Sequence, residues 1–97
     1  MPKGKTEYKS QYTASALEDL IRIDRKESER IRKKIRFFAA QKDPLSFAEP
    51  LKGLEKCYRW RIGRFRIIFR RDTNTQQLHI LWILAIRKRD KAYKKLS

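Results

Sequence analysis

Arginines alternate with apolar side chains on both sides of the dipeptide Gly63-Arg64, and this pattern predicts a β-hairpin whose turn is formed by these two residues. Counting outward from the turn places Arg61 directly opposite Arg66. The same sheet face would carry the two remaining arginines of the motif, Arg59 and Arg70. Like charges at opposed positions repel, so this pairing does not stabilise the sheet. Guanidinium groups grip phosphate or carboxylate oxygens in bidentate fashion, which predicts an anion-binding face.

A second group of candidates follows the last apolar run. Arg87 has the same parity as Leu81, Ile83 and Ala85, so it should leave the end of the apolar strand on one defined face, shared with these residues. Tyr93 follows six residues later, and cations that we expect to bind RNA lie between them, namely Lys88 and Arg89. A tyrosine among cations can have a lowered phenol pKa or can stack on a base. The alternative is a solvated basic tail with one aromatic anchor.

The overall charge points to an acidic partner. The 97 residues, which we expect to form one domain over 1–97, contain 26 Lys and Arg against 11 Asp and Glu, for a net charge of +15. A general surplus of surface cations would explain part of the arginine pattern without any function. The single Cys57 and single His79 have no metal-ligand spacing, so we expect no metal and no cofactor. No run approaches the ~20 apolar residues of a membrane span, and we expect a cytoplasmic protein.

The elements that would position these residues follow from periodicity. Residues 5–12 predict a strand, Ser15 begins a short helix with a capping box, and Asp24 caps a longer helix. The loop 43–56 should tuck four apolar residues onto the core, namely Leu45, Phe47, Leu51 and Leu54. Three strands follow over 57–62, 65–71 and 78–86, the last central, and 90–96 predicts a final helical turn. The fold class is α+β, with two helices packed on a mainly antiparallel sheet in the order β-α-α-β-β-β.

The longer helix has an apolar stripe of Ile31, Ile35 and Phe38. Its other faces carry cations that we expect to contact RNA, namely Arg32, Lys33, Lys34 and Arg36. An ordinary solvated helix face is an equally good interpretation.

The hairpin Tyr58-Arg-Trp-Arg-Ile-Gly-Arg-Phe-Arg-Ile-Ile-Phe69 and the preceding Pro50-Leu-Lys-Gly-Leu54 resemble the middle of the RelE/ParE superfamily of bacterial toxins. The segment from Arg87 to Tyr93 resembles the C-terminal arginine-to-tyrosine segment of the RelE branch. The resemblance covers residues 8–93 and implies the toxin of a type II toxin–antitoxin system, with a cognate antitoxin, the ribosome and mRNA as partners.

For the RelE branch, the resemblance implies a metal-free, ribosome-dependent endoribonuclease, in which the ribose 2′-hydroxyl attacks its own 3′-phosphate in the A site. Arg66 and Arg87 would bind the scissile phosphate, and Tyr93 would be the general base. Arg59 and Arg61 stand where RelE has assisting lysines, and arginine supplies charge but does not shuttle protons. The assignment of acid and base therefore stays open.

Two other residues and two other functions come into question. His79 lies within the last strand and is interpreted as a packed or edge residue, and Asp90 as a cap of the final turn. A ParE-like inhibitor of DNA gyrase would not cut RNA, and that branch generally lacks the arginine-to-tyrosine segment. A simple RNA-binding module would form no product.

Overall fold

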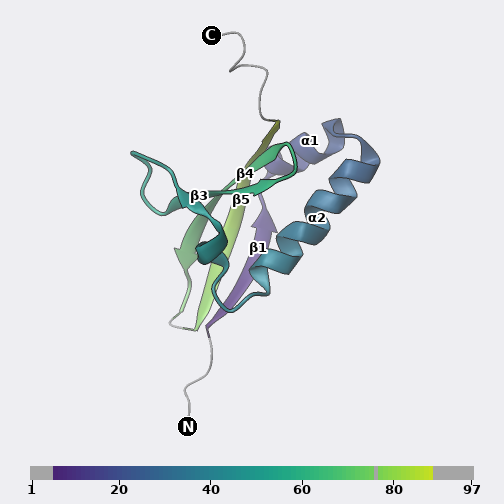
Figure 1. Cartoon of the computed structure of the whole chain (residues 1–97). Coiled ribbons are helices and arrows are strands. Elements are labelled where there is room, and N and C mark those ends of the chain that lie inside the picture. Colours follow the sequence, from purple (N-terminus) through teal and green to yellow (C-terminus); the bar gives the residue numbers. More distant parts are fainter. Residues whose placement is uncertain (1–5, 76, 89–97) are drawn as a thin grey trace.

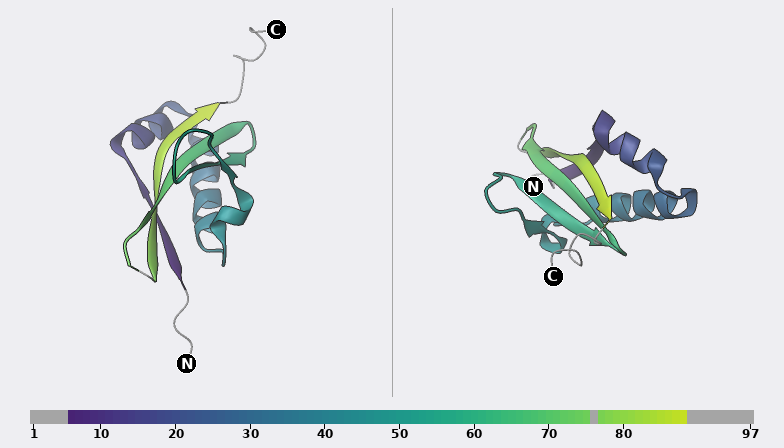
Figure 2. Two further views of the ribbon diagram at one scale, coloured as in Figure 1. Left: turned by 90° about the vertical axis from the view of Figure 1, so that its left-hand side faces the viewer. Right: turned by 90° about the horizontal axis from the view of Figure 1, so that it is seen from above.

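The computed structural model describes residues 6–75 and 77–88, which form one sheet with two helices against it. In chain order the elements are β1 (Glu7–Tyr12), α1 (Ala14–Arg22), α2 (Arg25–Ala39), the 3₁₀ turn η1 (Pro44–Phe47), β2 (Glu49–Pro50), β3 (Cys57–Ile62), β4 (Phe65–Thr73) and β5 (Leu78–Lys88). The views in Figures 1 and 2 show both helices on the same face of the sheet. The expected α+β class and element order are confirmed, with β2 as an addition.

The sheet order is β1-β5-β4-β3-β2. β1 runs parallel to β5, and every other neighbouring pair is antiparallel. β5 is an interior strand, between β1 and β4, as its apolar side chains on both faces predict. We call the sheet surface turned away from the helices the distal face. No helix within the described part of the chain is long and apolar enough to cross a membrane.

The first helix begins differently from the sequence prediction. Thr13, not Ser15, is the N-cap of α1, and its side-chain oxygen accepts a hydrogen bond from the Ala16 amide at 3.1 Å. The Thr13 hydroxyl also donates to the Ile83 carbonyl at 3.1 Å, which ties the helix start to β5. Asp24 is the N-cap of α2 as expected, but its side chain makes no capping hydrogen bond. A contact with β5 therefore decides where α1 begins.

The core lies between α2 and the sheet. The predicted stripe of α2, Ile31, Ile35 and Phe38, is buried. Trp60 of β3 is fully buried, and its ring stacks on Phe69 of β4 with centroids 4.0 Å apart. The Trp60 Nε1 donates to the Pro44 carbonyl at 3.2 Å, so its one polar group is satisfied. This packing fixes the helix-facing side of β3 and β4, and thereby which side chains point to the distal face.

The segment between α2 and β3 is only partly as expected. Leu45 and Leu51 are half-buried, but Phe47 and Leu54 are 49% and 56% exposed, so their predicted burial is wrong. η1 turns Pro44 inward, and the Phe47 ring stacks on Phe38 from outside, with centroids 5.2 Å apart. The final helical turn predicted for 90–96 lies outside the described residues.

Candidate functional site

The β3–β4 hairpin has the register predicted from the sequence. Gly63 has a φ of 60°, a backbone conformation that favours glycine, and Ile62 pairs with Phe65 across the turn. Arg61 is therefore directly opposite Arg66. Because the apolar partners on both strands face the helices, these two arginines lie on the distal face.

Arg87 lies on the same face as Arg61 and Arg66 because of a β-bulge in β5. The β4–β5 ladder changes register between residues 68 and 69, where Leu84 is the extra residue on β5. The parity argument, which placed Arg87 on the face of Leu81 and Ile83, is thus wrong, since those two residues face the core. The bulge turns Arg87 to the other face, where it pairs with Arg66.

Arg61, Arg66 and Arg87 form a line across β3, β4 and β5, which we call the arginine row. Adjacent strands are about 4.8 Å apart, so the three backbones span roughly 10 Å. Arg61 and Arg87 are exposed, and Arg66 is half-buried between them. Three guanidinium groups rooted this closely supply enough donors to hold one phosphodiester.

Two other predicted cations of this face have acidic partners. The Arg59 Nε donates to the Glu49 carboxylate at 3.2 Å, and the Arg70 guanidinium lies 3.3 Å from the Asp72 carboxylate. Part of their charge is therefore offset within the protein. Arg70 is also four residues from Arg66 along β4, or roughly 13 Å, and does not belong to the row.

Glu49 is a residue of this face that the sequence analysis missed. The hydrogen bond from Arg59 and the charges of Arg59 and Arg61 hold the pKa of the Glu49 carboxyl below its usual value. Glu49 lies opposite Arg59 because β2 pairs with β3. The one available signal was an acidic residue just before Pro50, and a two-residue strand is too short to show a pattern. The result is a carboxylate beside the arginine row.

The C-terminal candidates are only partly described. Lys88 pairs with Phe65 and therefore lies on the helix-facing side, opposite to the arginine row. Arg89, Asp90 and Tyr93 lie outside the described residues. Arg87 is thus the described start of the predicted arginine-to-tyrosine segment.

The four cations of α2 lie apart from the row, because α2 covers the other face of the sheet. All are exposed: Arg32, Lys33, Lys34 and Arg36. The Lys34 ammonium lies over the Phe37 ring, 5.4 Å from its centroid. Burial raises the pKa of the nearby Tyr12 phenol above 10.0, and Arg32 and Arg36 partly oppose this effect.

His79 is not near the arginine row. It lies at the other end of β5, eight residues from Arg87 or roughly 26 Å along the strand. It is half-buried, with its ring edge-on to Tyr8 at 5.1 Å between centroids. In residues 6–75 and 77–88, no three potential ligands from His, Cys, Asp and Glu come together as a metal site would require.

A family model of bacterial toxins matches most of the chain. The family model described as ParE toxin of type II toxin–antitoxin system, parDE, matches residues 11–93. No curated protein sequence is significantly similar to the chain.

Three similar solved structures are RelE toxins. One is the toxin–antitoxin complex RelBE2 from Mycobacterium tuberculosis, with 22% identity, a TM-score of 0.60 and coverage of 91% of this chain and 98% of that one. Another is isolated E. coli RelE, with 15% identity, a TM-score of 0.61 and coverage of 92% and 94%. A mutant of E. coli RelE bound to a peptide of its antitoxin RelB has 15% identity, a TM-score of 0.65 and coverage of 95% and 96%.

The family match covers most of the chain, and the RelE structures share its fold over nearly their whole length. The chain therefore belongs to the ParE toxin family, within the RelE/ParE superfamily of type II toxin–antitoxin toxins.

Proposed function

We propose that this toxin is a ribosome-dependent endoribonuclease that cleaves mRNA in the A site. The observation that carries the proposal is the arginine row, in which Arg61, Arg66 and Arg87 are aligned across three strands. Mutual repulsion makes such an alignment unfavourable for the fold alone. A bound phosphodiester would turn that cost into a favourable interaction.

The reaction is an intramolecular transesterification. The ribose 2′-oxygen forms a bond to the adjacent phosphorus while the bond from phosphorus to the 5′-oxygen breaks, which leaves a 2′,3′-cyclic phosphate. One proton leaves the 2′-oxygen and one is taken up by the 5′-oxygen. Arg66 and Arg87 would donate to the non-bridging oxygens, whose negative charge increases in the transition state. Arg61 would add charge from β3.

Two groups are candidates for the base. Tyr93 is the residue that the resemblance assigns, and the cations near it in the sequence would favour its phenolate form. Glu49 is the alternative, because its carboxylate lies beside Arg59 and is ionised at neutral pH. Arginines stay protonated, so none of the row can accept the proton. Comparing Tyr93→Phe with Glu49→Gln on cleavage rate assigns the base.

The ribosome would supply the positioning that this small site lacks. Cleavage requires the 2′-oxygen in line with the leaving 5′-oxygen, and a free RNA chain rarely adopts that geometry. α2, which carries the exposed cations, covers the sheet face opposite to the arginine row. These cations would contact ribosomal RNA while the row engages mRNA.

A cognate antitoxin is the expected protein partner. The solved RelBE2 complex and the RelE–RelB peptide complex each contain an antitoxin. A chain with a net charge of +15 favours an acidic segment that covers the arginine row.

The matching family model favours a second candidate, a ParE-like inhibitor of DNA gyrase without nuclease activity. Expression in bacteria, followed by mapping of mRNA 5′ ends, separates the two. Cleavage predicts new ends within codons, which Arg66→Ala abolishes. Growth arrest without new ends, together with loss of gyrase supercoiling in vitro, would establish the second function instead.

A further inference from the structure

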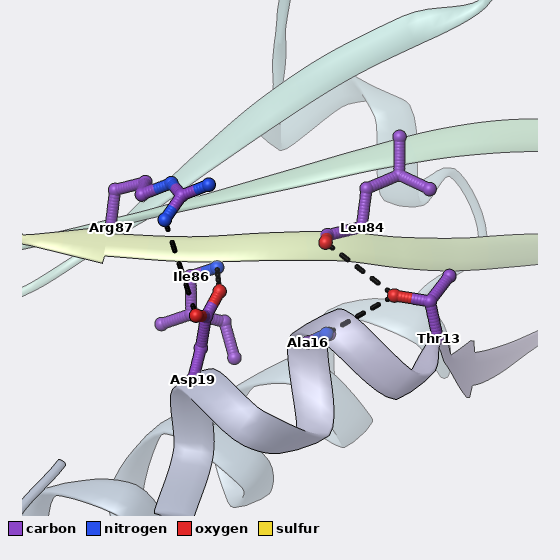
Figure 3. Close-up of polar contacts among 6 residues, drawn as sticks. All are labelled: Thr13, Ala16, Asp19, Leu84, Ile86 and Arg87. Carbon is purple, nitrogen blue, oxygen red and sulfur yellow. Dashed lines mark hydrogen bonds and ion pairs between the residues drawn. The ribbon is translucent and has the colours of Figure 1, made fainter. Parts of the chain in front are cut away.

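The end of β5 is held by helix α1. β1 pairs with β5 only as far as Ile83, so among the described residues the backbone beyond it has no strand neighbour on that side. The Ile86 amide donates instead to the Asp19 Oδ2 at 2.9 Å (Figure 3). Asp19 is only 8% exposed, and it is the one buried charged residue in the described part of the chain. Its carboxylate therefore completes the hydrogen bonding of the strand edge.

α1 contacts β5 on both sides of the bulge. Before it, the Thr13 hydroxyl donates to the Ile83 carbonyl at 3.1 Å and lies 3.5 Å from the Leu84 carbonyl. After it, Asp19 accepts from Ile86. The bulge is the feature that turns Arg87 to the distal face. α1 thus fixes the local irregularity on which the arginine row depends.

The second oxygen of Asp19 lies near one member of the row, Arg87. The Asp19 Oδ1 lies 4.0 Å from a terminal nitrogen of Arg87, whose side chain is 62% exposed. Figure 3 shows the contacts of the Asp19 carboxylate with the Ile86 amide and with the Arg87 guanidinium, which lies on the other side of the β5 ribbon. Both residues line a notch of about 310 Å³ between α1 and the end of β5, together with Phe65. Asp19 therefore restrains one terminal nitrogen of the Arg87 guanidinium, while the other donors of this group stay accessible.

We propose that Asp19 is a positioning residue for Arg87. One carboxylate oxygen holds the bulged strand end and the other limits the directions that the guanidinium can take. The row then meets a phosphate with Arg87 already oriented, which saves the entropy of ordering a long side chain during the reaction. As a statement about catalysis, this inference rests on the proposed nuclease function.

The first test removes the negative charge of Asp19 and keeps its hydrogen bond with the Ile86 amide. In Asp19→Asn the amide oxygen still accepts from Ile86, so the melting temperature should stay close to that of the wild type. The single-turnover cleavage rate on programmed ribosomes should fall roughly fivefold, the factor expected from an exposed ion pair at its upper limit. The apparent affinity for the ribosome should not change. Glu18→Gln, an exposed carboxylate on the same helix, is the matched control and should cleave at the wild-type rate.

A double-mutant cycle distinguishes positioning from a general structural role. In an Arg87→Ala background, Asp19→Asn should change the rate by less than about twofold, because the group on which it acts is gone. An equal loss in both backgrounds would overturn the inference. So would Asp19→Asn cleaving at the wild-type rate. Asp19→Ala leaves the buried Ile86 amide unpaired and should also lower the melting temperature.

A second readout does not depend on nuclease activity. The Nε–Hε group of Arg87 gives an NMR signal whose order parameter reports side-chain mobility. Asp19→Asn should lower that order parameter, while the Arg61 signal stays unchanged. An unaltered Arg87 signal would refute the positioning role. A wild-type protein that cleaves nothing would refute the proposed function alone, and the NMR result would then decide the role of Asp19.

Discussion

Arg61 and Arg66 are directly opposed across the β3–β4 hairpin, although like charges at that position repel. Arg87 extends the line on the other side of Arg66. The fold thus keeps two like charges opposed at a position where the turn sets the register. Residues that are retained at a cost to stability are typical of functional sites.

The first prediction concerns that cost. Arg61→Gln removes one of two opposed charges, so the free energy of unfolding should rise by about 0.5 kcal/mol and the melting temperature by about 2–4 °C at low salt. Thermal unfolding followed by circular dichroism measures the change. Arg64→Gln is the control, because it removes an exposed charge from the turn without an arginine opposite. Equal shifts in both variants would attribute the effect to net charge.

Sulfate should stabilise the protein through the same residues. With a dissociation constant of about 10 mM, 100 mM sulfate would add roughly 1.4 kcal/mol to the free energy of unfolding. The gain in melting temperature should shrink in Arg61→Gln and Arg87→Gln. Sodium chloride at matched ionic strength controls for screening, and the variants control for the general stabilising effect of sulfate. A gain that is equal in all three proteins would rule out a specific anion site.

Arg87→Ala should lower the cleavage rate on programmed ribosomes by roughly 10²-fold or more, as removal of one preorganised donor to a developing oxyanion does. Single-turnover kinetics, with the fraction of cut mRNA as readout, measures the loss. Lys52→Ala, which removes an exposed cation from the loop before β3, should retain the full rate. A loss below threefold would mean that Arg87 contributes only surface charge.

Neutralising α2 should affect binding and not the chemical step, because the helix lies on the other side of the sheet from the arginine row. The substitutions are Arg32→Gln, Lys33→Gln, Lys34→Gln and Arg36→Gln. Ribosome affinity should fall, and its dependence on log salt should become shallower by roughly 0.7 for each phosphate that the helix no longer neutralises. The rate at saturating ribosomes should be unchanged. A slower saturated rate with an unchanged salt slope would place these cations in the reaction.

The Glu49 carboxyl should contribute to acid stability. Its pKa in the folded protein is lowered from the ordinary value of 4.5, chiefly by the hydrogen bond from Arg59. A lowered pKa means that the contribution is complete above the unfolded-state value and is lost as the pH falls through the folded-state value. The difference in melting temperature between wild type and Glu49→Gln should be constant near neutrality and disappear at acidic pH. A difference that grows on acidification would contradict this assignment.

The sequence predicted the parts of the site that local rules determine. A glycine at the turn fixes the pairing of Arg61 with Arg66, because every further pair follows from the turn by counting. The stripe of α2 follows from helical periodicity in the same way. Both depend on residues close together in the chain.

The missed features depend on contacts between distant segments. The bulge at Leu84 is invisible in the sequence, because β5 is apolar on both faces and shows no alternation that could break. Asp19 lies on a helix whose pattern assigns no role to it, and its partner Ile86 is 67 residues away. Glu49 acquires its role from pairing with β3. Such roles become visible only when the strands are placed side by side.

In the sheet, β1 pairs with β5, which is the last strand in the described part of the chain. β5 in turn lies between β1 and β4. During synthesis the first strand and both helices therefore leave the ribosome without the strand that joins them to the hairpin. The site is incomplete until residue 87 has been added and has paired with β4. Under the proposed nuclease function, a partly made chain would lack the complete arginine row, so the order of strands would delay cleavage activity until β5 is in place.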